Sequence, residues 1–119
     1  MSANIDLETA IAPILENLKE SSDLIPAIAQ DFASKEVLML AWMNRDALKL
    51  TAKTGNATYW SRSRKEIWVK GSTSGHYQKV KELKYDCDSD AVLLLVEQLG
   101  AACHTGEYTC FHNSIEIGN

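Results

Sequence analysis

The chain has 119 residues, of which 45% are hydrophobic and 24% are charged, and this length and composition are typical of one soluble globular domain. Its formal charge of −4 argues against a protein that coats nucleic acid, because such binding depends on phosphate neutralisation by Lys and Arg. The sequence lacks the ~18 consecutive apolar residues of a membrane span and the basic and apolar regions of a targeting segment. We therefore expect a cytoplasmic protein that binds neither membrane nor nucleic acid.

The first half of the chain predicts two helices and a pair of strands. Apolar residues recur at helical intervals over 5–20, which predicts an N-terminal helix within residues 1–20 that begins close to Pro13. Segments 24–30 and 37–43 are expected to form short buried strands around a turn at 31–35. Asn44 is a suitable N-cap for a helix over 45–53, and Gly55 is placed to end that helix in a left-handed conformation.

The second half predicts mainly strands. Residues 57–75 should form a hairpin, because aromatic and β-branched residues flank a polar tip and the segment closes in the loop GSTSG at 71–75. The alternation over 78–90 predicts a long strand. Residues 91–99 could form a helix or a strand, and their short length before Gly100 favours a strand. Because no repeat or linker suggests subdivision, residues 1–119 are interpreted as a single domain.

All three cysteines lie near the C-terminal end, at Cys87, Cys103 and Cys110. Three thiols cannot all pair within one chain, and without an export signal they should stay reduced, so metal binding or catalysis is favoured over disulfides. Three thiolates would fill three corners of a tetrahedral Zn²⁺ site and leave the fourth for water. His104 or His112 could close such a site or transfer protons beside it. The alternative is that the thiols are small buried hydrophobic groups.

Three carboxylates surround the first cysteine. If residues 85–90 are extended, then Asp86, Asp88 and Asp90 share one face of the strand, and a divalent cation such as Mg²⁺ would relieve their mutual repulsion. A solvated acidic turn is the alternative. A calcium-binding loop is disfavoured, because Ala91 occupies the position where that loop requires Gly, although Glu97 falls at its twelfth position.

Cationic and hydroxyl side chains gather around the predicted hairpin. They suit a phosphate group, although a solvated hairpin tip explains them equally well. Trp60 and Trp68 could stack on a base, but hairpin aromatics more often pack in the core. The candidate substrate-binding residues are Arg62, Arg64, Lys70, Ser72, Thr73 and Ser74.

Four ordered segments resemble the motifs of the phosphoribosyl-AMP cyclohydrolase family, whose enzymes open the adenine ring of phosphoribosyl-AMP in histidine biosynthesis. They are LAWMNRDAL, YWSRSRKEIWVKGSTSG, DCDSDAVLLLVEQ and ACHTGEYTCF, within residues 25–111. The resemblance implies a β-rich fold, a pseudobarrel or a two-sheet sandwich with few short helices, in an obligate, intertwined homodimer. It also implies a Zn²⁺ ion held by Cys87 of one chain with Cys103 and Cys110 of the other, and Mg²⁺ at Asp86, Asp88 and Asp90.

The family's reaction suits these residues. Zinc-activated water would attack C6 of the N1-alkylated adenine and the N1–C6 bond would break, with no organic cofactor. His104 is the candidate for proton transfer, and His112, His76 or a carboxylate could take that role instead. A zinc nucleoside deaminase is disfavoured because neither H-x-E nor P-C-x-x-C occurs, and a zinc-stabilised RNA-binding module is disfavoured by the acidic pI of 5.3. We expect the chain to be too short to carry a second, pyrophosphohydrolase domain.

Overall fold

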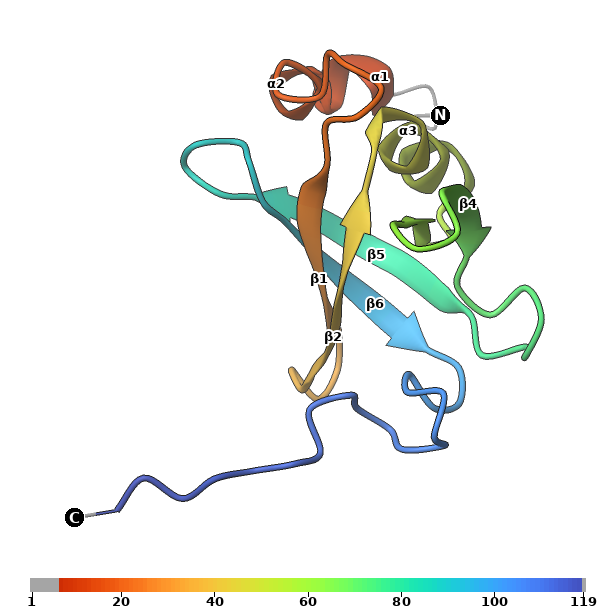
Figure 1. The fold of residues 1–119 in the computed structure, drawn as a ribbon, viewed down its shortest axis with the longest axis vertical. Helices are drawn as coiled ribbons and strands as arrows, with labels where there is room; N and C mark the ends of the chain where they lie inside the picture. Colours follow the sequence, from red (N-terminus) through yellow and green to blue (C-terminus); the bar gives the residue numbers. More distant parts are fainter. Residues whose placement is uncertain (1–6, 119) are drawn as a thin grey trace.

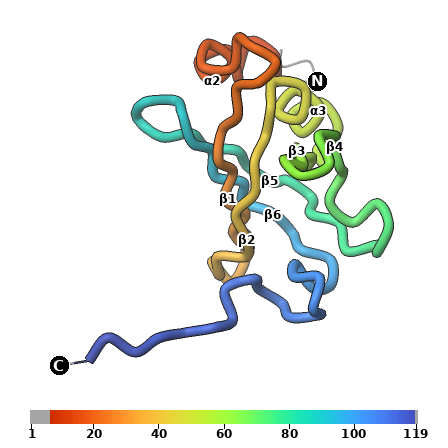
Figure 2. Tube along the Cα trace, in the orientation of Figure 1, coloured from red at the N-terminus to blue at the C-terminus, as the bar shows by residue number. Residues whose placement is uncertain are grey.

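A computed structural model describes residues 7–118, and within them a curled sheet of six strands dominates the fold (Figure 1). The strand order is β4-β3-β2-β1-β6-β5. Three short helices gather at one end of the sheet, and the loops that follow β6 lie at the other (Figures 1 and 2). The β-rich fold class is therefore confirmed, in the form of a half-barrel. The strands are β1 (Ile25–Asp31), β2 (Val37–Met43), β3 (Thr58–Ser61), β4 (Glu66–Val69), β5 (Gln78–Tyr85) and β6 (Val92–Gln98).

The N-terminal region differs from the single helix predicted over residues 5–20. It forms two four-residue helices, α1 (Leu7–Ala10) and α2 (Ala12–Leu15), and the start of the prediction, with Ile5, lies outside the described residues. Ile11 leaves helical geometry at ψ 5°, and Pro13 occupies the first turn of α2, where its missing N–H costs no hydrogen bond. The proline therefore begins a new helix instead of continuing the first.

The predicted helix after Asn44 is confirmed as α3 (Arg45–Thr54). The Asn44 side chain accepts a hydrogen bond from the Ala47 N–H at 2.8 Å, which satisfies one of the free donors of the first turn. Gly55 ends the helix at φ 79°, a left-handed conformation that glycine adopts without a Cβ clash. Both ends of α3 are thus set by local side chains.

The hairpin of β3 and β4 is also confirmed, with Tyr59 opposite Trp68. The residues before β3 reach across to β5, although the two strands are far apart in the sheet order. Asn56 forms a bridge with Lys79, the Ala57 N–H donates to the Gln78 carbonyl at 3.0 Å, and the Val80 N–H donates to the Gly55 carbonyl at 2.7 Å. This contact draws the two sides of the sheet together and explains its curl.

Strand β6 lies between β1 and β5, parallel to the first and antiparallel to the second. It is buried along most of its length, as a strand covered on both sides should be. The long strand predicted over 78–90 is wrong at its end, because β5 stops at Tyr85 and residues 87–88 form a turn. Ser89 has a φ of 59°, which is incompatible with an extended strand.

The core contains a buried polar chain that leads toward the loop after β6. Tyr59, fully buried, donates its hydroxyl to Gln78 Oε1 at 2.7 Å. Gln78 Nε2 donates to Gln98 Oε1 at 2.9 Å, and Gln98 Nε2 lies 3.5 Å from the Ala101 carbonyl. No buried side-chain nitrogen or oxygen in residues 7–118 lacks a partner. The core therefore positions the segment that precedes Cys103.

Candidate active site

The loop after β6 brings two of the three cysteines together. The Ala102 and Cys103 N–H groups donate to the carbonyls of Tyr108 and Glu107, each at 3.1 Å, so the chain folds back on itself between the two thiols. The loop is also fixed to the start of β2, because the Cys110 N–H donates to the Leu38 carbonyl at 2.7 Å and Thr109 Oγ1 to the Val37 carbonyl at 2.7 Å. Cys103 and Cys110 are therefore held close enough to interact directly.

Hydrogen bonds activate the first of these thiols. Thr105 Oγ1 donates to Cys103 Sγ at 3.0 Å, and His112 Nε2 lies 3.8 Å from the same sulfur. These contacts, led by the Thr105 hydroxyl, lower the pKa of Cys103 from 9.0 to about 6, since they favour the charged thiolate. Burial, followed by the charge of Cys103, raises the pKa of Cys110. At neutral pH the pair holds one thiolate and one thiol.

Lys70 supplies a positive charge beside the pair. Its Nζ donates to the Ala102 carbonyl at 2.6 Å and lies 5.8 Å from the centre of the Trp68 ring. Burial lowers the pKa of Lys70, and the neighbouring charges of Cys110 and Cys103 oppose that shift. A cation next to a thiol favours the thiolate, so Lys70 belongs electrostatically to the thiol site.

The third cysteine lies at the opposite end of β6. Cys87 is exposed in the β5–β6 loop, which precedes β6, whereas Cys103 follows it. The seven residues of β6 separate the two loops by roughly 20 Å at ~3.3 Å per residue (Figure 1). Accordingly, residues 7–118 of one chain contain no group of three or more His, Cys, Asp or Glu side chains placed to hold a metal ion.

The acidic loop around Cys87 is a structured turn. The Asp86 carboxylate accepts the N–H groups of Asp90 at 3.0 Å and Ala91 at 3.3 Å, and the first of these contacts is the main cause of its lowered pKa. The adjacent Asp86 carboxylate raises the pKa of Asp90. The amide of Asn17 donates to the carbonyls of Ser89 at 2.8 Å and Asp88 at 3.3 Å. A turn, and not one face of a strand, thus brings Asp86 and Asp90 together, and within residues 7–118 Asp88 does not complete a group of three placed to hold a metal ion.

The predicted substrate-binding residues lie in two places. Arg62 and Arg64 are exposed in the β3–β4 turn, where Arg62 stacks at 4.9 Å over the Trp42 ring and Arg64 pairs with Glu66 at 3.7 Å. Ser72, Thr73 and Ser74 follow Lys70 in the exposed β4–β5 loop. The structure does not bring these two groups together.

The three tryptophans are half-buried. Trp68 packs against Tyr59 with ring centres 5.1 Å apart, which is a core contact. Trp60 and Trp68 also line an open hollow of about 550 Å³, together with Trp42 and Arg62. The base-stacking role considered for Trp60 and Trp68 stays a prediction.

The three histidines differ in their surroundings. His112 lies next to Cys103, whereas His104 is exposed in the turn between the two cysteines. His76 packs against Gly100, where a Cβ would lie 2.5 Å from its ring. Sequence reasoning missed Thr105 as a donor to the thiol. The signal available was its place two residues after Cys103, a spacing within reach of a local side-chain hydrogen bond.

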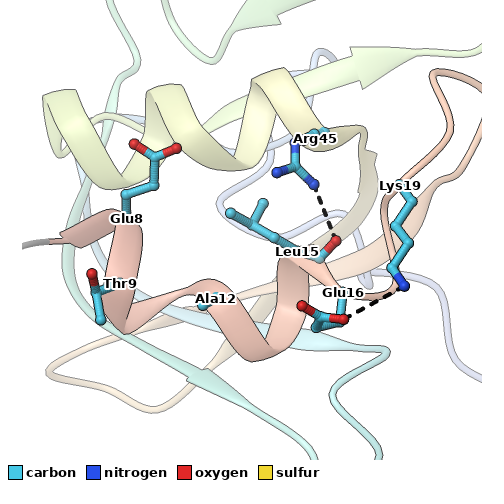
Figure 3. A pocket seen from close by; sticks show the side chains of 7 residues that line it. All are labelled: Glu8, Thr9, Ala12, Leu15, Glu16, Lys19 and Arg45. Atoms are coloured by element: carbon cyan, nitrogen blue, oxygen red, sulfur yellow. Dashed lines mark hydrogen bonds and ion pairs between the residues drawn. The ribbon is translucent and has the colours of Figure 1, made fainter.

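A separate hollow of about 500 Å³ lies between α1, α2 and α3 (Figure 3). Its charged groups are already engaged. Arg45 donates to the Leu15 carbonyl at 3.1 Å, Glu16 pairs with Lys19 at 3.6 Å, and Glu8 pairs with Lys49 at 3.1 Å. Because the helices lie at the other end of the sheet from the thiol loop, this hollow is not part of the candidate site (Figure 1).

No helix in the described residues is long and apolar enough to cross a bilayer.

A curled β-sheet whose strand β6 leads into a loop with two neighbouring thiols, one of them activated, defines a protein with a thiol-centred site, suited to metal binding or catalysis. The sequence pattern of one family, described as phosphoribosyl-AMP cyclohydrolase, matches residues 39–112. The chain therefore belongs to the phosphoribosyl-AMP cyclohydrolase family, and it is an enzyme.

Individual relatives agree with this assignment. Phosphoribosyl-AMP cyclohydrolase of Archaeoglobus fulgidus is 61% identical over 97 residues, which cover 82% of this chain and 90% of that protein. The Streptomyces coelicolor protein of the same name is 58% identical over 113 residues, 93% of this chain and 88% of its own. The histidine biosynthesis bifunctional protein HisIE of Thermosynechococcus vestitus is 57% identical, and the match covers 87% of this chain but only 50% of that protein.

Proposed function

We propose that this chain hydrolyses the N1–C6 bond of the adenine ring in phosphoribosyl-AMP, a step of histidine biosynthesis. One water is consumed: its oxygen becomes the carbonyl oxygen on C6, N1 leaves C6 and takes a proton, and C6 becomes a carboxamide carbon. The observation that carries the proposal is the family match over residues 39–112, which includes Cys110 and the activated thiol of Cys103. The names of relatives near 60% identity support it.

The donor set of the thiol loop fits a zinc ion. Cys103 and Cys110 are adjacent sulfur donors, and the lowered pKa of Cys103 favours the thiolate that binds metal. One chain offers too few ligands, because its Cys87 lies at the far end of β6. We therefore propose that Cys87 of a second copy completes the site in a homodimer. When bound, Zn²⁺ in such a site supplies Lewis acidity and lowers the pKa of water toward ~7.

The remaining residues of the loop bind, orient and move protons in this proposal. Lys70 holds the Ala102 carbonyl and fixes the thiol loop, so its primary role is to position the loop. Thr105 keeps the Cys103 sulfur charged. His104, exposed between the two thiols, delivers the proton to N1 as the C6 bond breaks. His112, within 3.8 Å of Cys103 Sγ, is the alternative proton carrier.

The acidic loop and the basic side chains complete the proposed substrate site. Asp86, Asp88 and Asp90 supply hard oxygen ligands suited to Mg²⁺, and the paired carboxylates of Asp86 and Asp90 would lose their repulsion on binding it. Arg62 and Arg64, with the hydroxyls of Ser72, Thr73 and Ser74, would bind phosphate groups. The two arginines and the three hydroxyls lie in separate loops of one chain, so in the assembled dimer they would meet from two chains.

Subunit mixing tests the shared site. Cys87→Ala and Cys103→Ala should each abolish both bound zinc and the absorbance change of ring opening. Each mixed dimer would contain one intact site and one doubly damaged site, so random mixing should restore about one quarter of the activity. Lys53→Ala, on the exposed end of α3, is the matched control and should remain active. Full loss without recovery on mixing would show that the site lies within one chain, and an active zinc-free Cys103→Ala protein would refute zinc chemistry.

A further inference from the structure

The segment that follows the thiol loop leaves the body of the protein. Residues 111–118 run outward, away from β5 and the helices (Figures 1 and 2). Ile115 is 86% exposed and Ile117 is 89% exposed. Within the described residues, 113–118 make no hydrogen bond or ion pair. An extended segment with large apolar side chains at alternate positions is suited to adding a strand to a sheet.

A groove of matching character runs along β5. It has a volume of about 350 Å³ and lies between this strand, α1 and α3. β5 is the last strand of the sheet, and beyond the bridge at Asn56–Lys79 no strand of the described chain lies along its outer edge. Leu7 and Tyr85, both in the groove, are 44% and 45% exposed. The apolar lining consists mainly of Leu7, Ala10, Ile11, Val80, Leu83 and Tyr85.

We propose that residues 113–117 of one copy add as an antiparallel strand to the free edge of β5 in a second copy, with Ile115 and Ile117 in this groove. The proposal rests on the proposed function, because the shared thiol site sets where the tail begins. That site would place Cys110 of one copy beside Cys87 of the other, and Cys87 lies two residues beyond the end of β5.

The chain lengths agree with this docking. Two thiolates on one Zn²⁺ ion have their sulfurs within ~4 Å, given Zn–S distances of ~2.3 Å. From that point, five residues lead forward to Ile115, a span of ~16 Å, and four lead back along β5 to Leu83, a span of ~13 Å. Ile115 would therefore lie beside Leu83, and Ile117 would reach the Val80 end of the groove. The tail of the same chain starts at the opposite end of β6 and runs away from β5 (Figure 1).

The register also sets which polar side chains meet. With Ile115 beside Leu83, antiparallel pairing places Ser114 beside the exposed Lys84 and Glu116 beside the exposed Glu82. Two carboxylates side by side do not attract, so the added strand would be held by its backbone hydrogen bonds and by the two isoleucines in the groove, and not by charge complementarity.

Photo-crosslinking tests the contact directly. The residue at position 115 is replaced by a photoreactive phenylalanine, and the labelled protein is mixed with an isotopically heavy copy that keeps Ile115. Crosslinks from position 115 to the heavy peptide that contains residues 80–85 are the expected result. Crosslinks only within the same copy, crosslinks to another surface, or a protein that stays monomeric at every concentration would overturn the proposal.

A matched pair of full-length variants measures the contribution of the tail. Ile115→Asp places a charge in the groove and should weaken the dimer at least tenfold by sedimentation equilibrium, whereas Ser114→Asp adds the same charge on the opposite face, beside Lys84, and should not weaken the dimer. Equal effects of the two variants would overturn the proposal. If the enzyme is active but Ile115→Asp does not weaken its dimer, the strand addition alone would be refuted. If the expected crosslinks form in a protein without ring-opening activity, only the proposed function would be refuted.

Discussion

The hydrogen bond from Thr105 to Cys103 makes a measurable prediction about thiol reactivity. Thr105 Oγ1 donates to Cys103 Sγ at 3.0 Å, and this contact is the largest cause of the pKa near 6. Thr105→Val keeps the shape of the side chain and removes only the hydroxyl donor. The pKa of Cys103 should therefore rise toward its ordinary value of 9.0, by an amount that the remaining contacts limit.

The size of the effect follows from the strength of such a bond. A hydrogen bond to a charged acceptor corresponds to roughly one to two pKa units. With a pKa near 6, about nine-tenths of Cys103 is thiolate at pH 7; a rise of one unit reduces that fraction to about one half, and a rise of two units to about one tenth. Alkylation at pH 7 should slow by about two- to tenfold, because the thiolate is the nucleophile.

The assay is the pH dependence of iodoacetamide alkylation in the metal-free protein, with Cys87, Cys103 and Cys110 separated by peptide mass spectrometry. Thr73→Val, an exposed change of the same chemistry, is the control and should leave the Cys103 profile unchanged. A Cys103 profile in Thr105→Val that superimposes on the wild-type profile would refute the assignment of this hydroxyl as the activating donor.

Three further predictions concern stability and the acidic loop. Tyr59→Phe leaves the buried Gln78 Oε1 without its donor at 2.7 Å, so the free energy of unfolding measured in urea should fall by ~1–3 kcal/mol. A fall of less than ~0.5 kcal/mol would contradict the role of this hydrogen bond. Cys103 should raise the free energy of unfolding of the metal-free protein as pH rises from 6 to 9, because the thiol in the unfolded chain keeps a proton that the folded thiolate has lost. Urea unfolding of Cys103→Ser should therefore show a weaker dependence of this free energy on pH between 6 and 9. Asn17→Asp keeps the side-chain shape but removes the donor to the Ser89 carbonyl, which holds the loop that contains Cys87. This change should reduce zinc affinity ~10-fold in a chelator competition, and unchanged affinity would show that the hydrogen bond from Asn17 does not position Cys87.

Local signals predicted the elements whose ends are fixed by neighbouring side chains. Asn44 and Gly55 define α3 through contacts within one turn, and the structure shows both. The N-terminal helix failed because apolar spacing continues across Ile11 and Pro13 while the backbone does not. The parallel pairing of β6 with β1 could not be read from either strand alone, since it joins segments more than sixty residues apart.

The candidate site shows the same division between local and distant information. Cys103 and Cys110 could be grouped from the sequence, because a short loop containing glycine can return on itself. The alternating acidic residues misled the strand prediction, because Asp86 uses its carboxylate to accept backbone N–H groups and so closes a turn. The cationic role of Lys70 depends on contact with the Ala102 carbonyl, thirty-two residues away, which no local pattern encodes.

The topology also keeps the three thiols of one chain from meeting at one site. β6 is rigidly held between β1 and β5, and it has Cys87 before it and the thiol pair after it. Joining all three sulfurs within a chain would require β6 to leave the sheet, with the loss of a buried apolar strand that includes Val92, Leu94 and Val96. Bringing in a second copy requires no such loss, because both loops lie at the surface. The sheet therefore favours a site built between chains, and the subunit-mixing experiment tests that arrangement independently of catalytic rate.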